Sequence, residues 1–88
     1  MKALPQTLRK NGFTYTQLLR GKKACIYEQG YAENIKYYEV FLLRIKPERI
    51  FKGKIIEERE AFPHDKAFGV WAWSFGSYEK AYQKYLEL

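Results

Sequence analysis

The C-terminal stretch, residues 67–88, constrains the fold more than any other part of the chain. Large and small residues alternate from Ala67 to Phe75, which predicts a strand with both tryptophans on one face. Gly76 interrupts this alternation, and Ser77 is a residue type that commonly caps the N-terminus of a helix. Apolar residues then recur at helical spacing and predict one stripe on a short helix, formed by Tyr78, Ala81, Tyr82, Tyr85 and Leu86.

A short amphipathic helix needs a flat apolar surface, and the preceding residues predict a sheet that supplies it. Phe13–Arg20 is rich in β-branched and aromatic residues and is expected to form a strand, although Tyr15–Arg20 would also suit a helix. A turn at Gly21-Lys22 and a return strand over Lys23–Gln29 would complete a hairpin.

The clearest strand signal in the middle of the chain lies at Lys36–Lys46. This segment is apolar on both faces, which is typical of a central strand, and Glu39 is the one charged exception on an otherwise apolar face. Pro47 ends the segment, and Gly53 predicts a turn in the basic connection that follows. Residues 54–61 suit either a polar edge strand or a charged helical turn, and we prefer the strand.

The N-terminal residues 1–11 predict little regular structure. Pro5 and the Asn11-Gly12 pair leave room for one or two helical turns at most, and part of this segment is expected to be a mobile arm. The whole pattern predicts one small domain over residues 1–88 with an α+β fold. We expect an antiparallel β-meander of about three to five strands with a C-terminal α-helix packed on one face.

The composition limits the compartment and the chemistry. Among 88 residues there is one cysteine, Cys25, so an internal disulfide is excluded and a reducing compartment is indicated. Cys25 lies in an apolar strand, where a buried and inert thiol is expected. No apolar run is long enough for a signal peptide or a membrane span, so we expect a cytoplasmic protein that does not bind a membrane.

The positive charge is concentrated in the first two-thirds of the chain. Residues 1–56 hold twelve Lys and Arg against four Glu, a net charge of +8, while residues 57–88 hold four against six, which restores the total of +6. A surface with this excess would attract nucleic acid or an acidic protein, although charge of this size also simply favours solubility.

Two groups of basic residues are the candidates for contact with phosphates. The first group is expected at one hairpin turn, and the second at the end of the central strand and in the connection after it. If both groups share one face, they would follow a phosphate backbone. The predicted contact residues are Arg20, Lys22, Lys23, Arg44, Arg49, Lys52 and Lys54.

No motif for catalysis or cofactor binding is present. His64 and Asp65, with the acids at residues 57, 58 and 60, form the one cluster that could imitate a metal or acid–base site. Their spacing matches no ligand pattern, and acids on one strand alternate between faces rather than converge. We therefore expect no enzyme activity, metal or cofactor, and we rank a small metal-dependent hydrolase built on His64 well below the other interpretations.

The tryptophans have two possible roles. Trp71 and Trp73 are expected to be either core residues beneath the C-terminal helix or a stacking platform for nucleic-acid bases on the opposite face. The core is preferred, because exposing two tryptophans together with Phe75 is costly.

Four short motifs follow one another along most of the chain: Tyr38-Glu39-Val40-Phe41, Glu60-x-Phe62-Pro63, Phe68-Gly69-x-x-Ala72-Trp73 and Glu79-x-x-x-Tyr82. In this succession the chain resembles a group of short uncharacterised proteins encoded by bacteriophages and conjugative elements. The resemblance implies a cytoplasmic, mobile-element context and assigns no activity.

A second resemblance covers the C-terminal end alone and rests on the pattern Trp71-x-x-x-Phe75-x-Ser77-x-Glu79-x-Ala81-x-x-x-Tyr85. This end is similar to the last strand and helix of the plant ethylene-response DNA-binding domain and of some phage integrase arm-binding domains, in which a three-stranded sheet enters the major groove. This chain lacks the arginine-dense first strands of those domains, so the similarity is one of architecture.

The sequence therefore favours a non-enzymatic binding module of a phage or mobile element, with DNA or RNA bound through a basic face. The alternative is a protein-interaction or inhibitory module that binds an acidic protein partner. No small-molecule substrate is expected in either interpretation.

Overall fold

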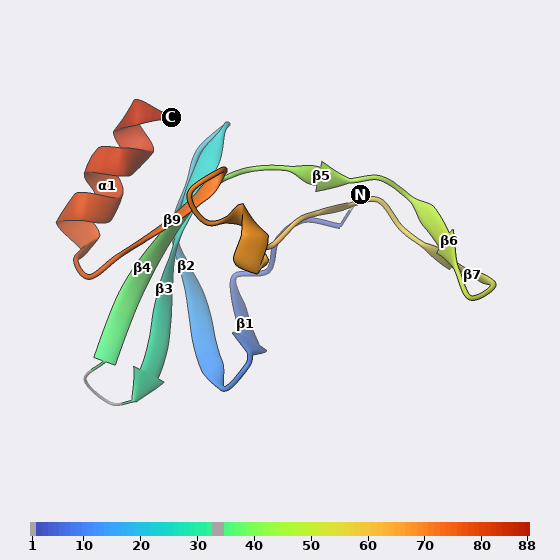
Figure 1. Ribbon diagram of the computed structural model, residues 1–88, viewed down its shortest axis with the longest axis horizontal. Helices are drawn as coiled ribbons and strands as arrows, with labels where there is room; N and C mark the ends of the chain where they lie inside the picture. Colours follow the sequence, from blue (N-terminus) through green and yellow to red (C-terminus); the bar gives the residue numbers. More distant parts are fainter. Residues whose placement is uncertain (1, 33–34) are drawn as a thin grey trace.

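The computed structural model describes residues 2–32 and 35–88 and is built on one five-stranded sheet (Figure 1). Its strands follow the order β1-β2-β3-β4-β9, and every neighbouring pair is antiparallel. One helix, α1, follows the last strand, so the predicted α+β fold with a C-terminal helix on a meander is confirmed. The elements are β1 (Thr7–Lys10), β2 (Phe13–Arg20), β3 (Ala24–Ala32), β4 (Ile35–Leu42), β9 (Ala72–Phe75) and α1 (Tyr78–Glu87).

The first hairpin forms because of the Asn11-Gly12 pair. Both residues have positive φ, 54° and 81°, which is the conformation that a two-residue hairpin turn requires. The turn pairs β1 with β2 from Lys10↔Phe13 to Thr7↔Thr16. The prediction of helical turns or a mobile arm over residues 1–11 is therefore wrong for residues 7–10, which form an edge strand of the sheet.

The helix covers one face of the sheet over β3, β4 and β9 (Figure 1). Ser77 caps it as predicted, since its hydroxyl oxygen accepts a hydrogen bond from the Lys80 amide at 3.3 Å. Where the helix meets the sheet, Ala81 of α1 and the sheet residues Ile26 and Val40 are completely buried. Leu19, Tyr38, Phe75, Tyr85 and Leu88 pack around this centre.

The apolar stripe of α1 is wider than its contact with the sheet. Ala81 is buried and Tyr85 half-buried, but Tyr78, Tyr82 and Leu86 are 38%, 41% and 64% exposed. The rings of Tyr78, Tyr82 and Tyr85 stack on one another along the helix, with 6.1 Å between successive ring centroids. The predicted stripe therefore contacts the sheet along its inner half, at Ala81 and Tyr85, while its outer half faces solvent.

The opposite face of the sheet is covered by the chain segment that leads into β9. This segment contains a 3-10 turn, η1 (Asp65–Ala67), and the ring of Phe62, which meets the rings of Tyr27 and Phe41 edge-on at 5.4 and 5.3 Å. Trp71 completes this second core and is 6% exposed, with its ring centroid 6.2 Å from that of Phe41.

The two tryptophans lie on opposite faces of the sheet. β9 begins only at Ala72, because Gly69 adopts a positive φ of 85° and residues 69–71 form turns. Trp73 lies on the helix side, where the Lys84 ammonium is 4.3 Å from its ring centroid. The prediction of one strand over residues 67–75 with both tryptophans on one face is therefore wrong, whereas the preference for core over an exposed platform holds for Trp71.

After Leu42 the chain leaves the sheet and forms a long hairpin, residues 44–60, which we call the arm. Figure 1 shows the arm leaving the body on the side away from α1. β5 pairs with β8 and β6 pairs with β7, and the hairpin turns at Lys52 and Gly53 with positive φ of 50° and 76°. Its strands are β5 (Ile45–Lys46), β6 (Arg49–Phe51), β7 (Lys54–Ile56) and β8 (Arg59–Glu60).

The arm decides two further predictions, the single strand over Lys36–Lys46 and the strand over residues 54–61. Lys36–Lys46 is not one strand. The bond from the Leu43 amide to the Lys23 carbonyl, 2.8 Å, extends the pairing with β3 by one residue, but the Arg44 carbonyl accepts from the Ala61 amide at 2.8 Å and the chain there changes partner. The strand preference for residues 54–61 is confirmed at β7 and β8, and so is the turn at Gly53.

Candidate nucleic-acid interface

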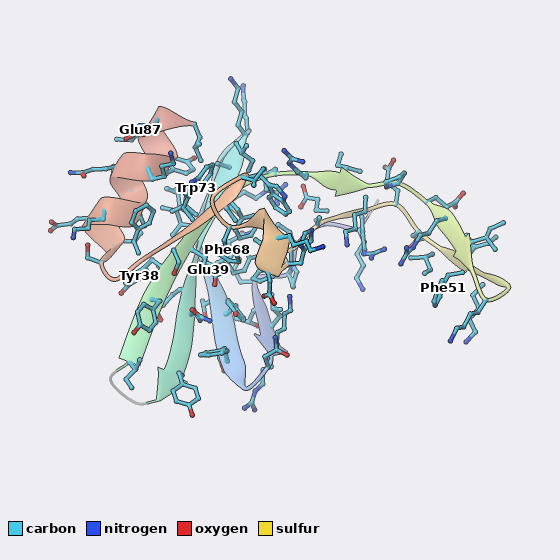
Figure 2. The ribbon with its side chains drawn as sticks, in the orientation of Figure 1. Tyr38, Glu39, Phe51, Phe68, Trp73 and Glu87 are labelled. Carbon is cyan, nitrogen blue, oxygen red and sulfur yellow. The ribbon has the colours of Figure 1, made fainter. Side chains whose placement is uncertain are left out.

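The tip of the arm presents basic side chains around one aromatic ring. In the β6–β7 pair, Arg49 lies opposite Ile56 and Phe51 lies opposite Lys54. Because alternate residues of a strand point to opposite faces, Arg49, Phe51 and Lys54 share one face of the ribbon. Figure 2 shows Phe51 at the far end of the arm.

The positive charges at the tip lie close to the ring of Phe51, which is 52% exposed. The Arg49 guanidinium is 5.5 Å and the Lys52 ammonium 5.4 Å from the ring centroid, which is within the range of cation–π attraction. Residues 49–54 contain no acid, and in the described part of the chain no carboxylate pairs with Arg49, Lys52 or Lys54. The acids of the arm lie before and after the tip, at positions 48, 57, 58 and 60.

The opposite face of the same ribbon is aliphatic. Ile50 and Ile55 are paired across the two strands and are 77% and 70% exposed. The sequence predicts Ile50 in a basic connection and Ile55 in a polar edge strand, and it predicts an exposed apolar surface at neither residue. The signal that could have found them is the pair of short apolar runs, Ile50-Phe51 and Ile55-Ile56, on the two sides of the Lys52-Gly53 turn.

At the root of the arm, Arg44 and Lys46 are exposed. The Arg44 guanidinium lies 5.2 Å from the ring centroid of Trp71, so this cation stacks on the second core. Arg44 and Lys46 thus continue the positive charge from the tip of the arm to the body.

Arg20 has a different environment from the other predicted contact residues. Its two terminal nitrogens donate to the two carboxylate oxygens of Glu60 at 2.7 and 2.5 Å. Glu60 also accepts a hydrogen bond from the Leu4 amide at 2.9 Å. The hydrogen bonds from Arg20 are the main reason that the pKa of Glu60 is lowered. Arg20 therefore ties β8, at the base of the arm, to β2 and to the N-terminal segment.

Lys22 and Lys23 are exposed at the turn between β2 and β3. They border a shallow depression of about 320 Å³ together with the C-terminal residues Tyr85, Leu86 and Leu88. The backbone of Lys23 bonds to Leu43, so this turn lies beside the root of the arm and not beside its tip. The structure thus separates the predicted basic residues into an arm group, a turn group and the ion-paired Arg20.

No family model, no curated protein and no solved structure matches this chain. The resemblance to short phage and conjugative-element proteins therefore stays a prediction. The comparison with domains that insert a three-stranded sheet into DNA meets a physical obstacle. Here one face of the sheet is covered by α1 and the other by Phe62, Trp71 and η1, which leaves the arm as the projecting β-structure.

The other candidate residues, His64 and Cys25, do not form a metal or catalytic site in the described part of the chain. His64 is exposed and its ring centroid is 6.2 Å from that of Trp71. Within residues 2–32 and 35–88, no three His, Cys, Asp or Glu side chains come together as a metal site would require. Cys25 is completely buried, and burial raises the pKa of its thiol to about 12, which keeps it protonated and unreactive. No helix in the described ranges is long and apolar enough to cross a membrane.

Proposed function

We propose that this protein is a non-enzymatic nucleic-acid-binding module and that the arm is its contact element. The observation that carries the proposal is the exposed two-stranded tip, where Arg49, Lys52 and Lys54 surround Phe51 without an acidic neighbour in residues 49–54. Lysine and arginine bind phosphates and release the counterions condensed on nucleic acid. A two-stranded ribbon also fits the major groove of duplex DNA, which is about 12 Å wide.

The root of the arm adds a second set of contacts to this proposal. Arg44 and Lys46 lie on the arm, and Lys22 and Lys23 lie on the turn beside its root. The bidentate Arg20–Glu60 pair fixes the base of the arm, which lowers the conformational entropy that binding would otherwise cost. Arg20 serves the proposed interface by holding the arm, not by contacting phosphate.

A cytoplasmic, mobile-element context belongs to the same proposal. It is supported by the single thiol, Cys25, and by the phage-like motifs around Tyr38-Glu39-Val40-Phe41.

The test is a fluorescence anisotropy titration of labelled random-sequence duplex DNA and single-stranded RNA. The arm variant combines Arg49→Gln, Lys52→Gln and Lys54→Gln. At about 0.5–1 kcal/mol for each exposed charge contact, the three changes should weaken binding roughly ten- to hundredfold. The loss should be similar for every sequence, since phosphate contacts carry no sequence information.

A matched control separates this effect from a general loss of charge. Arg9→Gln, Lys66→Gln and Lys80→Gln remove one arginine and two lysines from exposed positions outside the arm. The control variant should bind within about threefold of the parent, because these positions make no proposed contact. Equal losses in the arm and control variants, or no binding by the parent at low salt, would overturn the proposal.

A second candidate function is supported by the aliphatic face of the arm. Ile50 and Ile55 form an exposed apolar pair on the face opposite the basic one, and such a pair suits a protein partner with an acidic rim. In this interpretation Ile50→Thr with Ile55→Thr would abolish binding to that protein, while the nucleic-acid titration would show no response to the arm variant. Threonine keeps the β-propensity of the ribbon, so the double variant tests the apolar surface and not the fold.

A further inference from the structure

A cavity of about 180 Å³ lies on the face of the main sheet opposite α1, between the sheet and the segment that covers it. Four of its ten lining residues are aromatic and come from distant parts of the chain: Phe13, Tyr15, Phe62 and Phe68. The charged groups at the wall are Glu39, Asp65 and Lys10. Figure 2 shows Glu39 and Phe68 together in the body of the molecule, far from Phe51 on the arm.

Glu39 is the unusual residue of this cavity. It lies near the middle of β4, paired with Tyr27 of β3 and Ser74 of β9, and is 5% exposed. Its Oε1 atom has no hydrogen-bond partner among the described residues, although a buried carboxylate is costly without one. Burial raises the pKa of Glu39 to about 7, against a smaller opposing effect of Lys10. The sequence signal for it was the single charged residue on an apolar face.

The aromatic wall around this carboxyl is suited to positive charge. The Tyr15 and Phe62 rings meet edge-on at 4.9 Å, and Phe13 lies 6.3 Å from Tyr15. At the rim, the Lys10 ammonium is 5.3 Å from the ring centroid of Phe62 and donates to the Pro63 carbonyl at 3.4 Å. The wall thus already holds one ammonium group of the chain itself at its edge.

We propose that this cavity is a binding site for a small organic cation, with Glu39 as its counter-ion and the aromatic rings as a cation–π surface. A cation would give the unpaired carboxyl oxygen the partner that it lacks. The wall contains two carboxylates, Glu39 and Asp65, and one ammonium group, Lys10, so its net negative charge disfavours an anionic ligand. A metal ion is a poor fit, since the described residues contain no cluster of three metal-binding side chains.

The test uses propylammonium chloride as the probe, titrated into the full chain at pH 8 and followed by amide NMR shifts. The expected result is saturable shifts confined to the cavity residues, among them Tyr15, Gln29 and Glu39. Glu39→Gln keeps the shape and removes the charge, so it should weaken this binding at least about tenfold. Glu57→Gln makes the same chemical change at an exposed site on the arm and should leave the affinity unchanged.

A second variant keeps the proposal open to refutation if Glu39→Gln fails to fold. Lys10→Gln removes the competing ammonium from the rim and should tighten propylammonium binding several-fold. Shifts that do not saturate below about 100 mM, or an equal affinity in Glu39→Gln, or no tightening in Lys10→Gln, would each overturn the proposal. Glu39→Gln should leave nucleic-acid affinity unchanged, so this proposal and the proposed function of the arm fail separately.

Discussion

The buried carboxyl of Glu39 makes the stability of this protein depend on pH in a direction that is easy to test. Burial raises its pKa from an ordinary value of 4.5 to about 7 in the folded state. The folded chain therefore holds this proton more tightly than the unfolded chain, so the contribution of Glu39 to stability falls as pH rises from 4.5 to 7. With about 1.4 kcal/mol for each pKa unit, the loss between pH 4.5 and pH 8 is about 3 kcal/mol.

The perturbation is Glu39→Gln, which cannot ionise, and the assay is urea denaturation of parent and variant between pH 4.5 and pH 8. Glu60 has the opposite dependence: its pKa is lowered, so the stability that it contributes is lost as pH falls to 4.5 and below. This effect occurs in both proteins and cancels in the difference. The free energy of unfolding of the variant relative to the parent should rise by about 3 kcal/mol from pH 4.5 to pH 8. A difference constant within about 0.5 kcal/mol would show that Glu39 is solvated or paired in the folded protein.

Three further predictions concern the packing of the helix and the base of the arm. Tyr85→Ala should destabilise the fold by about 2 kcal/mol and Tyr82→Ala by less than about 1 kcal/mol, because Tyr85 packs between the helix and the sheet whereas Tyr82 is exposed. Equal losses in urea denaturation would contradict this. A Cβ at Gly21 would lie 2.0 Å from the Tyr85 hydroxyl oxygen, so Gly21→Ala should cost about 1 kcal/mol and Tyr85→Phe should relieve most of it in a double-mutant cycle. Arg20→Gln removes the bidentate pair with Glu60 and should cost about 1–2 kcal/mol, with faster amide exchange in residues 44–60 than in the main sheet; uniform exchange changes would refute the anchoring role.

Most of the main sheet could be predicted from local sequence patterns. β2, β3 and the helix depend on signals within a few residues, such as the hairpin turn after Arg20 and the cap at Ser77. Where a strong local signal was underweighted, the prediction failed. The Asn11-Gly12 pair specifies a two-residue turn, and β1 is its direct consequence.

The arm and the second core could not be predicted in this way, because they depend on partners far along the chain. Apolar residues continue past Leu42 as in a strand, yet from Arg44 onward the backbone bonds to residues 59–61 and the chain departs from the sheet. Trp71 follows the alternation of its neighbours in sequence, but the turn at Gly69 places it on the other face. An alternation pattern gives the face of a residue only while the strand continues.

The sequence predicted which residues of the candidate interface are basic, but not how the fold arranges them. The excess of lysine and arginine in residues 1–56 is a property of the sequence, and most of those residues are exposed. Arg20 could not be separated from the others, because its partner Glu60 lies 40 residues away in the sequence. Glu39 carried a visible signal as the one charge on an apolar face, but its cavity is closed by residues 62–68, which no local pattern brings there.

The central claim is that the arm tip contacts phosphates, and the salt dependence of binding tests it most directly. For each phosphate contact on duplex DNA, the slope of log Kobs against log salt concentration changes by about 0.9. Replacing Arg49, Lys52 and Lys54 with glutamine should therefore make the slope of the parent shallower by roughly 2–3, while the control variant at Arg9, Lys66 and Lys80 keeps the parent slope. Identical slopes for the parent and the arm variant would contradict the claim that the arm is the contact element.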